Sequence, residues 1–454
     1  MDTFLLNFDC TKHLNMLKSA LCQITKYEEI KTPSFEAAQA YYNVGKLEEC
    51  EQVVLELQKN DMVTKAVKKL QQNIQIQKLQ ISEGKYDFKS MVEEAKENFV
   101  VKCQNYVNPN IEIREAGNKR FGYFAKSKIE MGTKLIVEKA FLIAEQQQMF
   151  QQLLVKDQLK DSQMAQYKAL RGGDISLSFF NLQEKYSKNG FSSFPRLEDE
   201  LKKDSLKLEV LTLSSCTINH SCLPNAYWYF IGDVQFIITQ RQIEENEQIF
   251  LQYVDPSQVT FVKQPDEIRR LFGFECECEM CQNMTQQQRA EISKLTIHLE
   301  MKIKAQDKDG ATQNDISSVE DICKRVVKIF DESCARRSAL LHYYTELSYV
   351  LQTSGNISNI RKAIDVGIKA LESFGIDGAQ ARIGQLVMIP NAKHYMNFQA
   401  VGAILNILSF CFIVSKGEVK NWLKVLEQVF YKVTGGCDDY KYFLKNRLEI
   451  SGVK

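Results

Sequence analysis

Two cysteine-containing segments constrain the fold of this chain more than any other feature. The first is Asn219-His220-Ser221-Cys222, and the second, about 50 residues later, is Cys276-Glu277-Cys278-Glu279-Met280-Cys281. The second segment supplies three thiolates in C-x-C-x-x-C spacing, one fewer than the four ligands of a structural zinc ion. We expect Cys222 to supply the fourth. Such a site would tie the later segment back over the Asn-His turn and close a pocket.

The number and placement of the cysteines indicate a reducing compartment. The chain has 13 cysteines in 454 residues, and no basic stretch followed by a long apolar segment marks a secretory signal at its start. We interpret these cysteines as reduced thiols and metal ligands, and we expect the protein in the cytoplasm, the nucleus or both. Three cysteines within six residues are too dense for unrelated thiols. Cysteines outside the zinc site are expected to pack as small apolar side chains.

Length and charge limit the classes of function. A chain of 454 residues exceeds the size of a single core, so about two or three domains are expected. Its 58 lysines and arginines nearly cancel its 57 aspartates and glutamates, so no overall field attracts nucleic acid or an anionic membrane. The apolar segment 401–414 is shorter than the roughly 20 residues of a membrane span, which favours a buried helix. We therefore expect neither direct nucleic-acid binding nor membrane insertion.

The first 105 residues are predicted to be helical. Apolar residues recur every three or four positions, with few glycines or prolines. One part has the spacing of small and large positions in a tetratricopeptide repeat (TPR) of roughly 34 residues. These positions are Ala38, Tyr41, Gly45, Leu47, Cys50, Val54 and Leu57. A generic helical hairpin gives the same pattern and stays an open alternative, because single-repeat matches are degenerate.

A β-rich domain is predicted from residue 106 to residue 285. Asn108-Pro109-Asn110 breaks the helical pattern, and short segments that read as strands separated by turns follow. These segments are 111–114, 121–125 and 135–138, and a hairpin is expected over 227–238 with its turn at Gly232-Asp233. The cysteine-containing tail, about 272–285, closes the domain.

Helical regions interrupt and follow this β-rich domain. A helical insert is predicted at about 145–190, and residues 286–454 are predicted to be helical. In the latter region, Ala363, Gly367 and Ala370 indicate close helix packing of the repeat type. The predicted fold class is therefore α+β, with an irregular β-rich core between all-α, TPR-like regions at both ends.

In chain order, these motifs resemble those of the SET-domain lysine methyltransferases. The resemblance is carried by the segment Arg120 to Ala125, Asn219-His220-Ser221-Cys222 with Pro224-Asn225, the segment Glu247 to Tyr253, and the cysteine tail. The helical insert and the helical C-terminal region are similar to the SET-and-MYND group, although no MYND zinc finger follows Ala140. The helical N-terminal region looks like that of the tetratricopeptide-repeat SET proteins of fungi and protists.

The resemblance implies an S-adenosylmethionine-dependent protein-lysine N-methyltransferase that acts on histone or non-histone proteins. Tyr253 would be the catalytic residue that orients the substrate amine. Residues implied in cofactor binding are Arg120, Gly122, Tyr123, Asn189, Asn219, His220, Tyr253 and Phe274, with Phe191 beside Asn189. The zinc ligands would be Cys222, Cys276, Cys278 and Cys281, the post-SET arrangement. The partners would be a substrate lysine in a protein or peptide, and a partner protein bound by the helical repeats.

Ordinary structural roles stay open for these residues. A tyrosine after an alternating run is otherwise a packed strand residue, and an Asn-His pair is more often a turn. Phe274 has apolar packing as its alternative, and Asn189 has a loop-capping role.

Three positions depart from the family pattern. Arg120 stands at the first glycine of the opening motif, where its side chain would either crowd the cofactor or point to solvent and meet the cofactor carboxylate. Phe272 stands where the SET-and-MYND group often has tyrosine, which removes a hydroxyl from the expected channel. Asn246 replaces a glycine and tolerates the same turn conformations. The first two departures support an alternative, an interaction scaffold whose SET domain has lost turnover.

Overall fold

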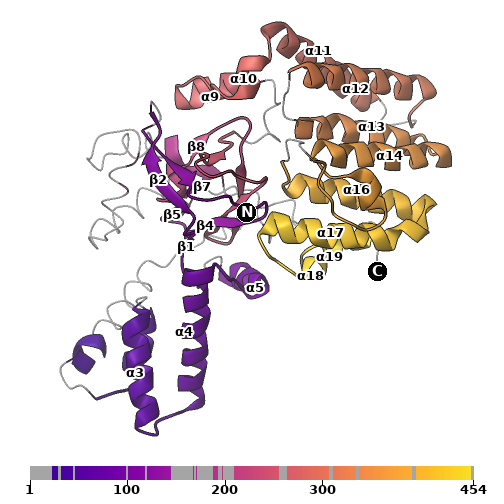
Figure 1. Cartoon of the computed structure of the whole chain (residues 1–454). Helices are drawn as coiled ribbons and strands as arrows, with labels where there is room; N and C mark the ends of the chain where they lie inside the picture. The colour runs from indigo at the N-terminus through magenta and orange to yellow at the C-terminus, as the bar shows by residue number, and fades with distance from the viewer. Residues whose placement is uncertain are drawn as a thin grey trace, which may run out of the picture.

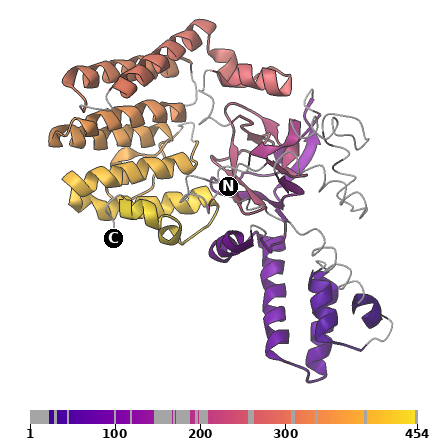
Figure 2. The same cartoon turned by 180° about the vertical axis from the view of Figure 1, so that it is seen from behind.

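The computed structural model places a β-rich core between an N-terminal helical arm and a C-terminal array of stacked helices (Figures 1 and 2). The structure describes residues 23–28, 32–43, 46–98, 101–117, 120–144, 167, 170, 188–192, 197, 209–254, 263–305, 310–333, 337–390 and 395–450. The predicted mixture of a β-rich core and flanking all-α regions is confirmed. The TPR-like character and the domain boundaries stay predictions.

The N-terminal arm consists of amphipathic helices. They are α2 (Phe35–Asn43), α3 (Leu47–Lys59), α4 (Lys65–Glu83) and α5 (Phe88–Asn98). Helix α3 buries one face, which includes Cys50, Val54 and Leu57, against α2 and α4. Thr64 begins α4 by accepting a hydrogen bond from the Val67 amide at 3.2 Å, and Gly84 ends it at a φ of +62°. The arm is thus a helical hairpin of α2 and α3 extended by α4, whereas α5 packs its apolar face against the main core.

The β-rich core is built around a four-stranded antiparallel sheet. Its order is β1 (Tyr106–Val107), β4 (Lys134–Lys139), β10 (Val234–Thr239) and β9 (Ala226–Ile231). The predicted hairpin is confirmed as β9 and β10, joined at Gly232 and Asp233. All six residues of β10 are buried because alternate side chains enter two different cores. Phe236 faces the core shared with the C-terminal helices, whereas Ile237 faces the interior of the β-rich core.

Smaller sheets complete the core. The predicted strands at 111–114 and 121–125 are present as β2 (Ile111–Glu115) and β3 (Phe121–Ala125), and they form an antiparallel pair. Strand β7 (Glu209–Leu211) lies between β5 (Leu142–Ala144) and β6 (Phe191–Ser192). Most of the predicted helical insert at 145–190 lies outside the described residues.

The C-terminal region is a stack of helical layers (Figure 1). Its helices and those that lead into it are α9 (Gln264–Phe272), α10 (Glu279–Asn283), α11 (Gln286–Ala305), α12 (Gln313–Ser333), α13 (Leu341–Thr353), α14 (Ile357–Ser373), α15 (Gly378–Arg382), α16 (Phe398–Val414), α17 (Val419–Thr434), α18 (Tyr440–Phe443) and α19 (Lys445–Ile450). The apolar segment 401–414 lies in α16, where most of its side chains are buried. Within the described ranges, no helix combines the length and apolarity that a membrane span requires.

The end of α17 joins the helical array to the central sheet. The Tyr229 hydroxyl donates to the Thr434 carbonyl at 2.7 Å, and the Tyr227 hydroxyl donates to the Val433 carbonyl. The Lys134 ammonium group donates to the Gly435 carbonyl. These bonds satisfy carbonyl groups that a helix leaves unpaired at its C-terminus. They also hold β9, and the turn that precedes it, against the C-terminal end of α17.

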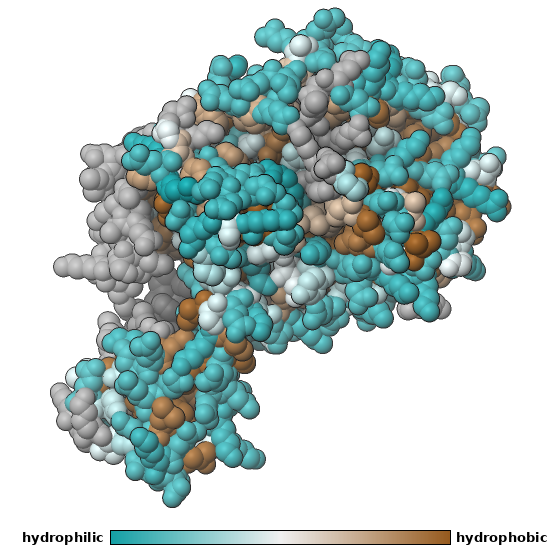
Figure 3. Space-filling view, in the orientation of Figure 1, coloured by the Kyte–Doolittle hydropathy of each residue, from teal (hydrophilic) through white to brown (hydrophobic). Residues whose placement is uncertain are grey.

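Hydrophilic residues cover most of the visible surface, with small hydrophobic patches on the arm and on the C-terminal helices (Figure 3). Ile76 and Leu79 on α4 are among the exposed large apolar side chains.

Two glycines in the C-terminal helices provide a matched test of the packing. A methyl group at Gly367 in α14 would lie 2.6 Å from Cγ1 of Ile407 in α16, so the close packing expected of this small residue is confirmed. We expect Gly367→Ala to lower the free energy of unfolding by about 1–3 kcal/mol. In α16, Gly402 has no described atom within 4 Å of such a methyl group, so Gly402→Ala should raise it by about 0.5–1 kcal/mol. Urea denaturation of both variants measures the difference, and equal effects would contradict the packing.

Candidate functional site

The two segments that carry the central motifs lie side by side. Strand β8 (Asn219–His220) pairs in parallel with β11 (Phe250–Leu251), and the Ser221 amide donates to the Leu251 carbonyl at 3.0 Å. Parallel strands need a crossover connection between them, and the β9–β10 hairpin lies in this connection. The Asn-His motif and the segment that ends in Tyr253 therefore meet in one layer of the fold.

Asn225 fixes this crossing. Its buried amide nitrogen donates to the Gln248 carbonyl at 2.8 Å and to the Glu247 carboxylate at 3.1 Å, and its amide oxygen accepts from the Phe250 amide at 2.8 Å. The sequence analysis quoted Asn225 as part of a motif and gave it no role. Its position directly after Pro224, in a turn, was the available signal.

Glu247 strengthens the same crossing through its charge. Its carboxylate accepts a hydrogen bond from Nη1 of Arg241 at 3.1 Å and another from the Glu244 amide at 3.0 Å. Burial raises the pKa of Glu247, but these bonds, with that from Arg241 foremost, outweigh it and lower the pKa below its usual value. The carboxylate is therefore charged at neutral pH and holds the segment before β11 in place.

Glu138 anchors the segment before the Asn-His motif. This carboxylate is 5% exposed and accepts hydrogen bonds from the amides of Leu213, Ser214 and Ser215 at 2.9–3.0 Å. Successive backbone N–H groups of this kind form an anion-binding concavity that compensates a buried charge. The sequence analysis missed this role. The sequence feature that could have indicated it is a single carboxylate near the end of the buried strand β4.

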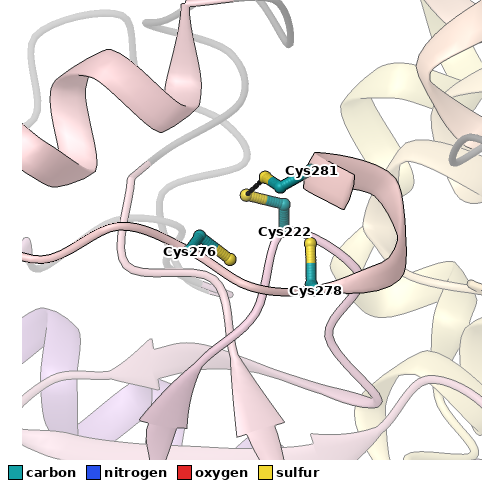
Figure 4. Close-up of side chains that lie close together, drawn as sticks. All are labelled: Cys222, Cys276, Cys278 and Cys281. Carbon is teal, nitrogen blue, oxygen red and sulfur yellow. Dashed lines mark hydrogen bonds between the residues drawn. The ribbon is translucent and has the colours of Figure 1, made fainter. Parts of the chain in front are cut away.

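Four cysteine side chains converge on one point (Figure 4). The sulfur atoms of Cys222, Cys276, Cys278 and Cys281 all lie within 4.8 Å of one another, and those of Cys222 and Cys281 are 3.6 Å apart. A tetrahedral zinc ion with Zn–S bonds of about 2.3 Å separates its sulfurs by roughly 3.8 Å. The cluster therefore has the ligand number, ligand type and spacing that could hold a zinc ion.

The surroundings of the cysteines differ. Cys222 is buried, whereas Cys276, Cys278 and Cys281 are half-buried. Hydrogen bonding within the cluster, first with the Cys222 thiol, lowers the pKa of Cys278 to about 7. Hydrogen bonding within the cluster raises the pKa of Cys222, and the hydrogen bond with Cys276 contributes most to this rise. A bound cation would instead favour the thiolate form at every ligand.

An aromatic cluster lies beside the cysteines. The ring of Tyr253 is centred 5.2 Å from that of His220 and 5.0 Å from that of Phe272, and the ring of Phe274 is 6.0 Å from that of His220. The Tyr253 hydroxyl donates to the Ile218 carbonyl at 2.8 Å. Helix α9 ends at Gly273, whose φ of +75° turns the chain between Phe272 and Phe274. The structure thus brings together four residues that span 55 positions from His220 to Phe274.

The backbone at Gly122 closely approaches two amide side chains. A methyl group at Gly122 would lie 2.2 Å from Nε2 of Gln248 and 2.8 Å from Nδ2 of Asn219, so a larger residue does not fit there. Asn219 Nδ2 donates to the Phe121 carbonyl at 2.9 Å. Nε2 of Gln248 is buried and has no hydrogen-bond partner among the described residues, which leaves a donor for a ligand. The sequence analysis assigned no role to Gln248.

Two of the departures from the family pattern are explained by backbone conformation. Arg120 and Asn246 both have a φ of +64°, in the left-handed region that glycine adopts most easily. The backbone therefore keeps the conformation expected of glycine at both positions. Arg120 is exposed, which matches the second of the two orientations left open for it, a side chain that points to solvent.

The remaining predicted residues lie in or next to the supporting strands. Tyr123 is buried in β3, and burial raises its pKa to about 12, so it stays neutral. The Asn189 carbonyl accepts a hydrogen bond from the Cys216 thiol at 3.1 Å, in η2 (Ser215–Thr217) just before Asn219. Phe191 packs edge-on against Trp228 at 5.4 Å. The cofactor roles of these residues stay predictions.

Comparison with known proteins agrees with this architecture. Residues 120–254 match the SET domain family. The chain is 34% identical over 68 residues to the SET domain and MYND-type zinc finger protein 6 of Schizosaccharomyces pombe, a match that covers 15% of this chain and 14% of that protein. It is 21% identical over 416 residues to a methyltransferase of Gibberella zeae, covering 78% of this chain and 56% of that protein.

A solved structure, the Neurospora SET domain protein DIM-5, a histone lysine methyltransferase, is 16% identical. It covers 32% of this chain and 52% of its own, with a TM-score of 0.20, too low to support an argument. The chain spans 14% and 56% of the lengths of the two curated relatives. The chain contains a SET domain at residues 120–254. The absence of a MYND finger and the TPR layout stay predictions.

Proposed function

We propose that this protein is an S-adenosylmethionine-dependent protein-lysine N-methyltransferase that acts on a histone or non-histone protein. The observation that carries this proposal is the position of Tyr253, which lies within a SET domain and contacts the rings of His220 and Phe272, both of which contact Phe274. The similarity to a methyltransferase of Gibberella zeae, which extends over 416 residues, also supports it.

The proposed reaction is an in-line displacement, in which the lysine nitrogen attacks the methyl carbon and the carbon–sulfur bond breaks. Alignment supplies most of the catalysis in such a step. Only the neutral amine is a nucleophile, and the ordinary lysine pKa is about 10.4. The apolar walls of Phe272 and Phe274 disfavour the charged amine. The Tyr253 hydroxyl donates its one hydrogen bond to the Ile218 carbonyl, so a lone pair on its oxygen can accept a hydrogen bond from the amine and orient it.

The residues around Gly122 suit a cofactor with hydrogen-bond acceptors. The buried donor of Gln248, together with Asn219, faces the backbone at Gly122. His220 and Phe274 would supply aromatic faces, and Arg120 a positive charge for the cofactor carboxylate. Tyr123 in β3 and Asn189, just before β6, would support this pocket. When bound, the cofactor supplies an activated methyl group.

The four cysteines would hold one structural zinc ion. With four protein ligands such a site is closed, so its role would be to fix the tail that carries Phe274 over the crossing. We further propose that the protein works in the cytoplasm or the nucleus and that its helical regions select the substrate protein or a partner.

The direct test measures transfer of labelled methyl groups from S-adenosylmethionine to a broad panel of proteins by the purified full-length chain. We expect label on lysine residues, identified by mass spectrometry. A protein that binds the cofactor but labels no lysine would contradict the proposal.

A second candidate, an interaction scaffold without turnover, is favoured by Phe272 in place of tyrosine and by Arg120 in place of glycine. Calorimetry separates the two. A scaffold with a blocked pocket would bind zinc and show no heat on addition of S-adenosylmethionine. The exposed position of Arg120 favours the enzyme.

A further inference from the structure

His220 contacts both the cysteine cluster and the backbone of Tyr253. Its Nδ1 accepts a hydrogen bond from the Tyr253 amide at 3.1 Å. Its Nε2 lies 3.4 Å from the sulfur of Cys222. The side chain is 4% exposed, so neither contact competes freely with water. The imidazole ring therefore spans the distance between the cysteine cluster and the tyrosine.

These contacts define the tautomer of a neutral ring. A backbone amide can only donate, so Nδ1 must be the unprotonated nitrogen. The proton is then on Nε2, which faces Cys222, and the N–H group donates to sulfur. A donor to a metal-bound thiolate stabilises its charge, and such outer contacts typically change metal affinity or activity by about 10- to 100-fold.

We propose that His220 is a positioning residue that couples the four-cysteine centre to the placement of Tyr253. This role goes beyond cofactor contact, and its relevance to catalysis rests on the proposed methyltransferase function. When the cysteines hold a metal ion, Cys222 is fixed and orients the ring, and the ring in turn fixes the Tyr253 amide. Without the metal, the ring loses its fixed acceptor and the Tyr253 backbone becomes more mobile.

Two substitutions separate the halves of this coupling. In His220→Asn, the side-chain oxygen takes the position of Nδ1 and keeps an acceptor for Tyr253, but the donor to Cys222 is lost. In His220→Gln, the amide nitrogen reaches the position of Nε2 and keeps the donor, but the acceptor is lost. His220→Ala removes both. His298→Asn, at an exposed position on α11, is the control for the chemical change.

Two measurements on the full-length, zinc-loaded protein do not depend on activity. The first is the rate of zinc release to an excess of a coloured chelator. We expect release to be roughly 10- to 100-fold faster in His220→Asn and His220→Ala and near the wild-type rate in His220→Gln and His298→Asn. The second is hydrogen–deuterium exchange of the peptide that contains the Tyr253 amide. We expect faster exchange in His220→Gln and His220→Ala but not in His220→Asn.

Removal of zinc tests the coupling itself. In the wild type, it should speed exchange at Tyr253, whereas in His220→Ala it should add little to an already fast exchange. Equal acceleration by zinc removal in both proteins would overturn the coupling. So would zinc release that is the same in His220→Asn as in the wild type. If these results hold and the wild-type protein transfers no methyl groups, the proposed function fails while the coupling stands.

Discussion

Cys222→Ala is expected to release the metal and abolish methyl transfer. Cys222 is the only one of the four cysteines that comes from the Asn-His segment, so its loss leaves three ligands on the tail and none on the crossing. Structural zinc sites contribute apparent binding free energies of about 10–16 kcal/mol. A three-ligand remnant would bind zinc far more weakly, and the tail that carries Phe274 would detach from the aromatic cluster.

Zinc content by elemental analysis and methyl transfer by label incorporation measure the effect. We expect zinc to fall well below roughly one per chain and transfer to fall by more than about 100-fold, because loss of a ligand exceeds the effect of an outer contact. Cys411→Ala is the matched control, since Cys411 is a buried cysteine of α16 outside the cluster. It should keep both zinc and activity. Retention of zinc by Cys222→Ala would contradict the four-cysteine site.

Local patterns in the sequence were sufficient for the elements that frame the site. The aromatic and β-branched runs on both sides of the Gly232-Asp233 turn predicted the β9–β10 hairpin, because strand preference and turn chemistry are local properties. The cysteine spacing gave the meeting of Cys222 with the tail, because a metal site has a fixed number of ligands. The position of Tyr253 beside His220 was expected only from the resemblance to the SET-domain proteins.

Contacts between a side chain and a distant backbone could not be predicted in this way. Glu138 binds amides about 75 positions away, and nothing in the residues 213–215 marks them as donors, since every non-proline residue has an amide. The hydrogen bonds between Asn225 and backbone groups of the segment 247–250 could not be predicted for the same reason. The left-handed backbone conformation of Arg120 could not be predicted from the residue type either, because arginine rarely adopts it.

Tyr253→Phe tests the proposed catalytic role with the smallest change. The ring would stay packed against His220 and Phe272, so fold and cofactor binding should change little. The hydroxyl that we propose accepts the amine hydrogen bond would be gone, and removal of one such positioned group typically costs about 100- to 1000-fold in kcat. We therefore expect kcat to fall by that factor. The dissociation constant for S-adenosylmethionine should stay within about threefold of the wild-type value, a change smaller than the loss of one such contact would cause.

Tyr431→Phe makes the same chemical change at an exposed position on α17 and should leave both quantities unaltered. The split between kcat and cofactor affinity is what distinguishes an oriented amine from lost packing. If the Tyr253 hydroxyl served only to hold the Ile218 carbonyl, its loss would lower thermal stability and weaken cofactor binding along with turnover. A Tyr253→Phe protein with wild-type kcat would mean that another group orients the amine, and the aromatic cluster would then be a packing feature of the SET domain.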